Sequence, residues 1–191
     1  MKIADLSLPG CRVITPFVFD DERGRFVKTY HAPSFREMGI DDVFVEDFYS
    51  MSRRGVVRGL HFQVPPAHGN KLVTCIEGRI FDVLLDLRRG SPTYGQHLTL
   101  TLDGAAGTLV YLPAGIAHGF CALSDGAVML YRMTAVHAAD CDKGIRWDSA
   151  GIEWPVQAPI LSKRDAAFPT LAGFASPFTY EGGEGTGRRS P

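Results

Sequence analysis

The sequence has no excess of charge of either sign, since 20 lysines and arginines face 21 aspartates and glutamates in 191 residues. A balanced chain has no overall field that would recruit nucleic acid or an anionic membrane, so neither is expected as a partner. No apolar run approaches the roughly 18 residues that a membrane span needs, and the N-terminal MKIADLSLPG lacks the apolar core of a signal peptide. These absences predict a soluble, cytoplasmic protein that holds any anionic ligand with local basic side chains.

Cysteines are few and show no pairing pattern. The four are Cys11, Cys75, Cys121 and Cys141, and no two of them form a CxxC pair. In a chain of this length, such cysteines are typical of free thiols in a reducing compartment.

Helical signals are also sparse, whereas strand signals are frequent. The best helix candidate is residues 32–38, where Pro33 suits a first helical turn. Residues 79–88 alternate with a period of two, with one apolar face and one face of mixed apolar and charged residues. The other strand candidates are residues 71–77, 97–102, 107–112 and 127–134.

The connections between these segments indicate one all-β domain. Glu77-Gly78 and Asp103-Gly104 separate successive strands with hairpin-like spacing. Many short strands at regular spacing favour an antiparallel sandwich or barrel, and the chain length allows a single domain, which we expect over residues 1–178. Residues 179–191 are polar and rich in glycine, so we expect them to form a disordered tail.

Two histidines lie in the segments richest in chemically useful side chains. His61 belongs to Arg58-Gly59-Leu60-His61-Phe62-Gln63, and in an extended strand His61 and Gln63 share a face. His118 follows the turn Pro113-Ala114-Gly115, at the start of a strand, where barrels often present ligand-binding groups. Taken alone, each histidine is more often a structural residue than a functional one.

A metal site is poorly supported around these histidines. In cupin barrels a metal is commonly held by a His-x-His pair, a nearby glutamate and a later histidine after Pro-x-Gly. Here Gln63 stands where the second imidazole would be, and residues 64–69 contain no carboxylate. A transition metal normally needs at least three strong donors, so we expect no metal and no cofactor.

A series of motifs extends from about residue 14 to residue 178. In chain order they are Asp21-Glu22-Arg23-Gly24-Arg25-Phe26, Arg58–Gln63, Lys71-Leu72-Val73, Asp82–Arg88, Ser91–Gly95, Pro113–Phe120, Tyr131, Gly144–Trp147, Trp154-Pro155 and Leu161–Asp165. In this order and spacing, the chain resembles the nucleotide-sugar 3,5-epimerases typified by dTDP-4-dehydrorhamnose 3,5-epimerase.

The resemblance implies a fold and a reaction. The fold would be an all-β, cupin-like jelly-roll barrel with few short helices, in a metal-free homodimer. The substrate would be a 4-keto-6-deoxyhexose on a nucleoside diphosphate, epimerised at C3, at C5 or at both, as in the conversion of dTDP-4-dehydro-6-deoxyglucose to dTDP-4-dehydrorhamnose in deoxysugar biosynthesis.

The resemblance also implies a role for individual residues. His61 would be the general base and Asp165 would orient it. Tyr131 would return a proton on the opposite face of the sugar, while Lys71 would stabilise the enolate oxygen. Arg23 and Arg58 would contact the diphosphate. The implied substrate-binding residues are Arg23, Phe26, Lys28, Glu46, Arg58, Gln63, His118 and His137.

These residue types suit the chemistry independently of the family. A hydrogen beside a ketone is removed by a base with a pKa near neutrality, which an unperturbed histidine has. The negative charge that develops on the ketone oxygen requires a cation or donor, and arginine's planar fork suits phosphate oxygens. Each residue also has a structural alternative: Tyr131 as core, Asp165 as a helix cap, Lys71 as a solvated lysine and the arginines in ion pairs.

Four positions depart from the family pattern. The family usually has glutamate at Lys28, glutamine at Glu46, asparagine at Phe48 and tyrosine near His137. Thymine offers an N3–H donor and an O4 acceptor, whereas cytosine offers an N3 acceptor and an amino donor, which would match Lys28 plus Glu46. A CDP-linked substrate is therefore one hypothesis, and a Lys28–Glu46 salt bridge with dTDP retained is the other.

Other functions remain open at this stage. An enzyme that epimerises one centre, or a ketoisomerase, would keep the histidine base and differ in where the acid lies. A non-catalytic, sugar-binding cupin would have lost the base or the acid, and a metal-dependent cupin enzyme would need the missing ligands.

Overall fold

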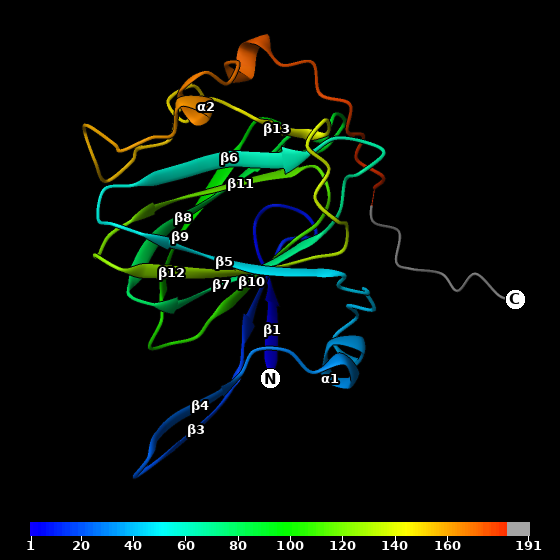
Figure 1. The fold of residues 1–191 in the computed structure, drawn as a ribbon. Coiled ribbons are helices and arrows are strands. Elements are labelled where there is room, and N and C mark those ends of the chain that lie inside the picture. Colours follow the sequence, from blue (N-terminus) through cyan, green and yellow to red (C-terminus); the bar gives the residue numbers. More distant parts are fainter. Residues whose placement is uncertain (183–191) are drawn as a thin grey trace, which may run out of the picture.

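The computed structural model describes residues 1–182 and contains two packed antiparallel β-sheets (Figure 1). The six-stranded sheet has, in spatial order, β1 (Lys2–Asp5), β2 (Arg12–Thr15), β10 (Leu109–Leu112), β7 (Lys71–Glu77), β12 (Ala127–Met133) and β5 (Glu46–Ser52). The five-stranded sheet has, in spatial order, β13 (Asp142–Gly144), β6 (Val57–Gln63), β11 (Ile116–Ala122), β8 (Arg79–Asp86) and β9 (His97–Asp103).

Helices are few and short. They are α1 (Ala32–Glu37), α2 (Lys163–Ala166) and a 3₁₀ turn at Leu171–Gly173. The prediction of an all-β jelly-roll barrel with few short helices is confirmed. None of the helices in residues 1–182 is long and apolar enough to cross a membrane.

Each face of the five-stranded sheet is buried against a different part of the chain. The residues packed between the sheets include Ile80 and Leu84 of β8, which meet Val73 of β7 and Met129 of β12. The opposite face of β8 packs against the C-terminal segment that runs from Ile145 to Phe178. The face of β8 that carries both apolar and charged residues is therefore the one between the sheets. Asp82 is on this face, inside the barrel, with no exposed surface.

The hairpin prediction for Glu77-Gly78 and Asp103-Gly104 is wrong. The strands on either side of Gly78 belong to different sheets, and so do those on either side of Gly104. These short turns are corners at which the chain crosses between sheets, as a jelly roll requires. The strands β8 and β9 do pair, through the longer connection.

A β-bulge interrupts β6 next to the site. In the pairing with β11, His118 lies opposite His61 whereas Phe120 lies opposite Arg58, so β6 carries one extra residue at Gly59-Leu60. A Cβ on Gly59 would lie 2.6 Å from Cα of Gly119, so the two strands approach too closely for a side chain there. The bulge brings Arg58 and His61 to the same cavity although they are three residues apart.

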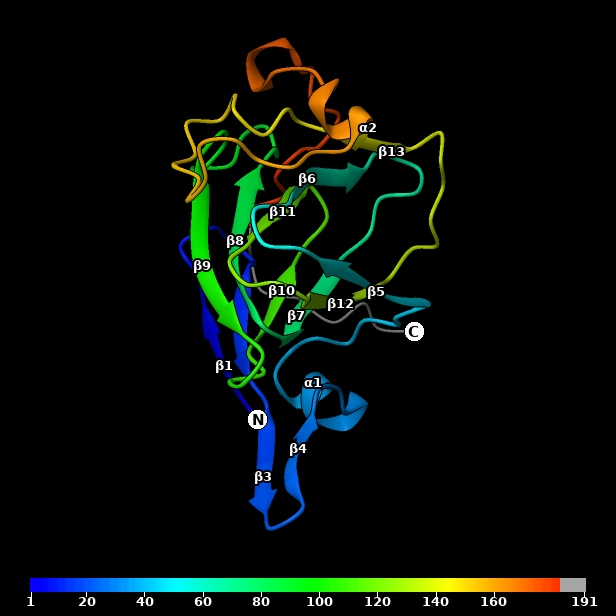
Figure 2. The same cartoon turned by 60° about the vertical axis from the view of Figure 1, so that its left-hand side comes forward.

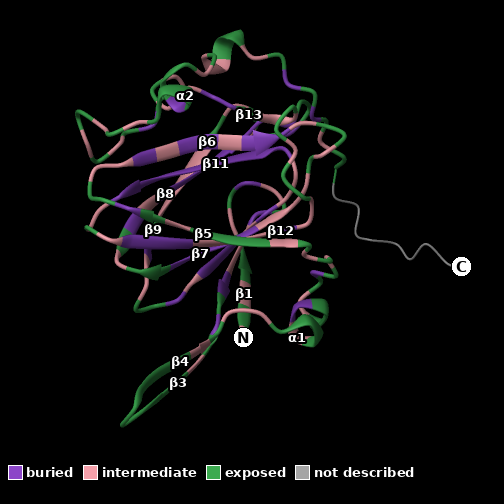
Figure 3. Ribbon diagram, viewed as in Figure 1, coloured by how far each residue is buried: buried purple, intermediate pink, exposed green. Residues whose placement is uncertain are grey.

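Strands β3 (Phe17–Asp21) and β4 (Gly24–Lys28) form a separate two-stranded arm. They pair only with each other and project beyond the two sheets (Figures 1 and 2). The arm is largely exposed in the single chain (Figure 3), including Phe17, Phe19 and Phe26, each of which is at least half exposed. Large exposed apolar side chains of this kind are typical of a surface that binds another protein.

The C-terminal segment is held to the barrel as far as Tyr180. The amide of Tyr180 donates to the carbonyl of Arg89, and its ring lies over the guanidinium of Arg88. The tail predicted for residues 179–191 begins in this described part, and residues 183–191 lie outside the described residues.

Candidate active site

A cavity of about 360 Å³ opens between the two sheets at the end where α2 and β13 lie. Its lining is rich in titratable and aromatic side chains from both sheets. The lining residues are Glu46, Phe48, Ser50, Arg58, His61, Phe62, Gln63, Lys71, His118, Phe120, Tyr131, Met133, His137, Asp142 and Arg164.

His61 on β6 is paired with Asp165 on α2. The distance from His61 Nε2 to Asp165 Oδ1 is 3.0 Å, and Asp165 Oδ2 accepts from the amide of Gly59 at 3.1 Å. Ser162 caps α2 by accepting from the amide of Asp165, which fixes where the carboxylate points. Burial alone would raise the pKa of Asp165, but the hydrogen bonds from His61 and Gly59 lower it to about 2. The carboxylate therefore stays ionised and orients His61.

Lys71 on β7 reaches the same cavity from the other sheet. Its Nζ donates to the backbone carbonyl of His61 at 2.9 Å, which places the ammonium beside the base. Burial lowers the pKa of Lys71 to about 8, and Asp142 partly opposes this shift. The ammonium form prevails at neutral pH and can stabilise a developing negative charge.

Tyr131 on β12 lines the cavity from the six-stranded sheet. Its ring stacks on Phe48 of the neighbouring strand, with ring centroids 4.8 Å apart and planes inclined by 13°. Burial raises the pKa of the Tyr131 hydroxyl. The neutral phenol is therefore its resting form, which is the form that can donate a proton.

Arg58 and His118 complete the group of predicted residues on β6 and β11. Arg58 donates to Ser52 Oγ and to the carbonyl of Met51, each at 3.0 Å, so its guanidinium is held at the cavity wall. His118 Nε2 lies 2.7 Å from Oδ1 of the fully buried Asp82.

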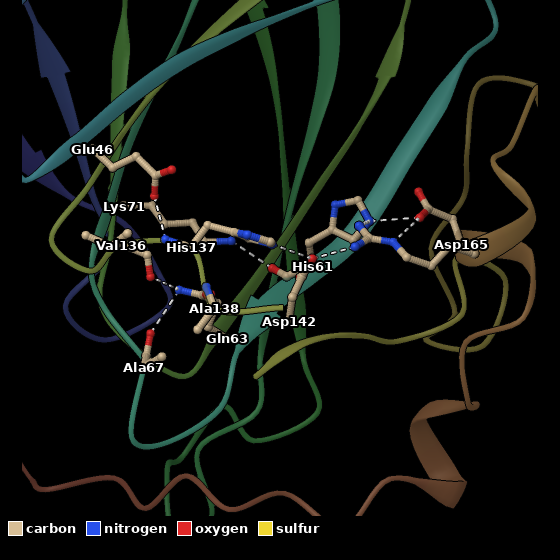
Figure 4. A network of polar contacts seen from close by, with 11 residues as sticks. Glu46, His61, Gln63, Ala67, Lys71, Val136, His137, Ala138, Asp142 and Asp165 are labelled. Atoms are coloured by element: carbon tan, nitrogen blue, oxygen red, sulfur yellow. Dashed lines mark hydrogen bonds and ion pairs between the residues drawn. The ribbon is translucent and has the colours of Figure 1, made fainter. Parts of the chain in front are cut away.

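The loop after β12 is tied to the cavity by Gln63 and Glu46 (Figure 4). The amide group of Gln63 donates to the carbonyls of Ala67 and Val136, and its oxygen accepts from the amide of Ala138. A carboxylate oxygen of Glu46 accepts from the amide of His137 at 2.7 Å. Both predicted substrate-binding side chains thus shape the loop, and both also line the cavity.

Three predicted substrate-binding residues lie outside this cavity. Arg23, Phe26 and Lys28 are on the β3–β4 arm, where Arg23 and Phe26 line a shallow depression of their own. The reason is topological, since the arm projects away from the barrel that carries the other predicted residues. Within residues 1–182 of the single chain no ion pair joins Lys28 to Glu46, whose carboxylate instead accepts from the amide of His137.

Sequence reasoning missed two charged residues of the cavity lining, Asp142 and Arg164. Arg164 pairs with Asp142, and its Nη2 lies 3.1 Å from Nε2 of His61. Arg164 adjoins Asp165 in the motif Leu161–Asp165 and could have been found there, whereas no sequence motif included Asp142. In the described part of the chain, no cluster of three or more His, Cys, Asp or Glu side chains has the geometry to hold a metal ion.

Comparison with known proteins finds relatives over most of the chain. The profile of the family described as dTDP-4-dehydrorhamnose 3,5-epimerase matches residues 5–173. The dTDP-4-dehydrorhamnose 3,5-epimerase of Methanothermobacter thermautotrophicus is 44% identical over 170 residues, which cover 86% of this chain and 91% of that protein.

Solved structures give the same result. The Legionella pneumophila 3,5-epimerase in complex with dTDP-4-keto-L-rhamnose has a TM-score of 0.89 at 34% identity, covering 94% of this chain and 98% of that one. A 3'-monoepimerase from Streptomyces bikiniensis in complex with dTDP-quinovose has a TM-score of 0.84 at 34% identity, covering 88% and 87%. The chain belongs to the dTDP-4-dehydrorhamnose 3,5-epimerase family of isomerases.

Proposed function

We propose that this epimerase inverts the carbons beside the ketone of a dTDP-linked 4-keto-6-deoxyhexose, converting dTDP-4-dehydro-6-deoxyglucose to dTDP-4-dehydrorhamnose. One observation carries the proposal: His61 and Tyr131 line a single cavity from opposite sheets, and Lys71 lines the same cavity and donates to the backbone carbonyl of His61. A base and an acid on opposite sides of a substrate are what an inversion requires.

Each inversion uses three groups of the cavity. His61 removes the proton from the carbon next to the ketone, and the carboxylate of Asp165 stabilises the imidazolium that forms. The ammonium of Lys71 stabilises the enolate oxygen. Tyr131 then donates its hydroxyl proton to the same carbon from the other face, which restores the C–H bond with inverted configuration.

Solvent isotope labelling tests this reaction. With dTDP-4-dehydro-6-deoxyglucose in D₂O, we expect deuterium at both C3 and C5 and NMR signals of dTDP-4-dehydrorhamnose. Deuterium at one carbon only would refute double epimerisation and indicate an enzyme that inverts a single centre, as the name of the S. bikiniensis 3'-monoepimerase states for that relative. Recovery of unchanged substrate with no label would leave a sugar-binding protein without catalysis.

The nucleotide is proposed to be dTDP. The four departures from the family pattern, at Lys28, Glu46, Phe48 and His137, bear on this choice because three of them line the cavity. Glu46 already accepts a hydrogen bond from the amide of His137, which leaves one carboxylate oxygen for a base. Turnover of matched dTDP- and CDP-linked substrates decides between the nucleotides, and a preference for CDP would refute this part.

The active unit is proposed to be a homodimer in which the β3–β4 arm of one protomer reaches the cavity of its partner. The exposed apolar arm and the placement of Arg23 and Phe26 outside their own cavity support this arrangement. If it is correct, an Arg23→Ala/Phe26→Ala variant and a His61→Asn variant complement each other, because a mixed dimer has one intact site. Random pairing gives about one quarter of wild-type activity on co-expression. Activity no greater than the sum of the separate variants would contradict the exchange.

A reducing compartment such as the cytoplasm is proposed from the cysteines. All four are free, and burial raises the pKa of Cys11 to about 12 and that of Cys75 to about 11. Buried thiols that stay protonated are unreactive, and they contribute to the fold by packing and not through a disulfide. Fractionation of cells with an antibody to the chain tests the location.

A further inference from the structure

The pair formed by His118 and Asp82 is not used by the mechanism above. Asp82 is fully buried and His118 is 4% exposed, yet both are polar and face the space between the sheets. One carboxylate oxygen of Asp82 lies 2.7 Å from His118 Nε2, and the other has no hydrogen-bond partner among residues 1–182. Burying a half-satisfied carboxylate costs free energy, so the pair calls for an explanation beyond packing.

The proposed reaction has a proton imbalance that some group must correct. After each inversion His61 holds a proton that it has taken, and Tyr131 lacks the proton that it has given. A tyrosinate is costly at this position, because burial raises the pKa of Tyr131. A second inversion on the same bound sugar requires that the proton return from the base to the acid.

His118 lies between the two groups. It is directly opposite His61 in the antiparallel pairing of β11 with β6, where facing side chains lie about 5 Å apart at their Cβ atoms. Its ring also contacts Tyr131 edge to face, with centroids 6.0 Å apart. With Nε2 bonded to Asp82, its Nδ1 has no hydrogen bond to the described part of the chain, and the residue itself lines the cavity.

The other cavity cations are unsuited to the task. Arginine does not release its proton in proteins, which excludes Arg58 and Arg164. Lys71 is engaged with the backbone of His61 and serves the enolate oxygen. Besides His61, two imidazoles line the cavity: His137 pairs with Asp142, whereas His118 lies opposite His61 and contacts Tyr131.

We propose that His118, held by Asp82, returns the proton from His61 to Tyr131 between inversions; this role rests on the proposed function. The N–H bond on His61 breaks as one forms on His118 Nδ1 through a water molecule of the cavity, and exchange of this water with the solvent makes the returned proton a solvent proton. That bond then breaks as the O–H bond of Tyr131 re-forms. The negative charge of Asp82 compensates the transient imidazolium of His118, so no net proton is gained or lost.

The role is distinguished from a structural one by counting turnovers. Enzyme equilibrated in D₂O is mixed with excess dTDP-4-dehydro-6-deoxyglucose, quenched at short times, and the sugar's deuterium content is measured by mass spectrometry. For His118→Asn we expect a burst of one deuterium per site, because Tyr131 starts protonated. A slow phase follows, with a rate about 10²-fold below the wild-type steady state, and added imidazole accelerates it.

Controls separate folding, function and relay. Asp82→Asn keeps the imidazole without its counter-charge and is expected to give the same burst, so the proposal does not depend on one variant. His97→Asn makes the same substitution on β9, outside the cavity lining, and is expected to follow the wild-type curve. Circular dichroism and dTDP affinity confirm that each variant is folded.

The outcomes are distinct. If folded His118→Asn and Asp82→Asn show no burst of one deuterium per site, the relay is overturned. This holds whether the variants incorporate deuterium quickly, slowly or not at all. A wild-type enzyme that incorporates no deuterium would instead overturn the proposed function. A burst whose slow phase responds to imidazole supports the relay and is not expected from a residue that only packs.

Discussion

Replacing Asp165 with asparagine keeps the size of the side chain and removes the charge that holds His61. In the native site the carboxylate accepts hydrogen bonds from His61 and from the amide of Gly59. An asparagine can accept only one of them, because its NH₂ group faces the other donor in either orientation. We therefore expect turnover to fall by about 10²–10⁴-fold, the range found for a misoriented histidine base.

The same substitution has a predictable cost in folding. The pKa of Asp165 is about 2 in the folded protein against an ordinary value of 3.8. This interval corresponds to about 2 kcal/mol of stability, since one pKa unit is worth about 1.4 kcal/mol. Because the folded value is the lower one, the contribution is complete well above pH 4 and is lost as the pH falls toward 2. At pH 3 about 1 kcal/mol of it remains.

Urea unfolding of wild type and Asp165→Asn at pH 7 and at pH 3 measures this difference, at one fixed protein concentration because the stability of the proposed dimer depends on it. The gap between the two proteins is expected to narrow by about 1 kcal/mol at the lower pH. Asp148→Asn serves as the control, since this exposed partner of Arg146 should shift stability by less than about 0.5 kcal/mol at both pH values. A gap for Asp165→Asn that stays constant with pH would refute the reasoning.

Three further substitutions have expected outcomes. In the wild type, kcat is expected to fall as the pH rises through about 8, where Lys71 loses its ammonium proton. Lys71→Gln is expected to lower kcat by about 10²–10³-fold. A wild-type kcat that stays constant at alkaline pH would exclude stabilisation of the enolate oxygen by Lys71. Tyr131→Phe abolishes inversion but retains exchange of the substrate hydrogen with D₂O, seen by NMR, because His61 still abstracts the proton. Gly119→Ala destabilises the fold by about 1–3 kcal/mol in urea, since its Cβ would lie 2.8 Å from the carbonyl of Arg58; an unchanged midpoint would contradict that contact.

Strand positions were predictable because their signal is local. The predicted strand at residues 71–77 matches β7, and those at 97–102 and 127–134 match β9 and β12 to within one residue. The pairing of the strands was not predictable from the turns. Gly78 occupies a short turn that would suit a hairpin, but burial of the apolar faces between two sheets requires a corner there.

The predicted site residues divide in the same way. His61 and Gln63 were expected on one face from simple alternation, and both line the cavity. Arg58 reaches the cavity only through the bulge at Gly59-Leu60, which no periodicity indicates. Arg23 lies on the arm, outside the cavity of its own chain, and in the proposed dimer its relation to a cavity depends on a second chain, so a single sequence pattern could not locate it.

The β3–β4 arm has a consequence for how such an enzyme can diverge. It is short, pairs only with itself and lies apart from the proton-transfer residues. Substitutions such as the lysine at position 28 leave the packing of the barrel core unaltered. In the proposed dimer, grafting residues 17–28 between relatives would therefore change what the arm presents to the partner's cavity and leave the lining residues of that cavity in place.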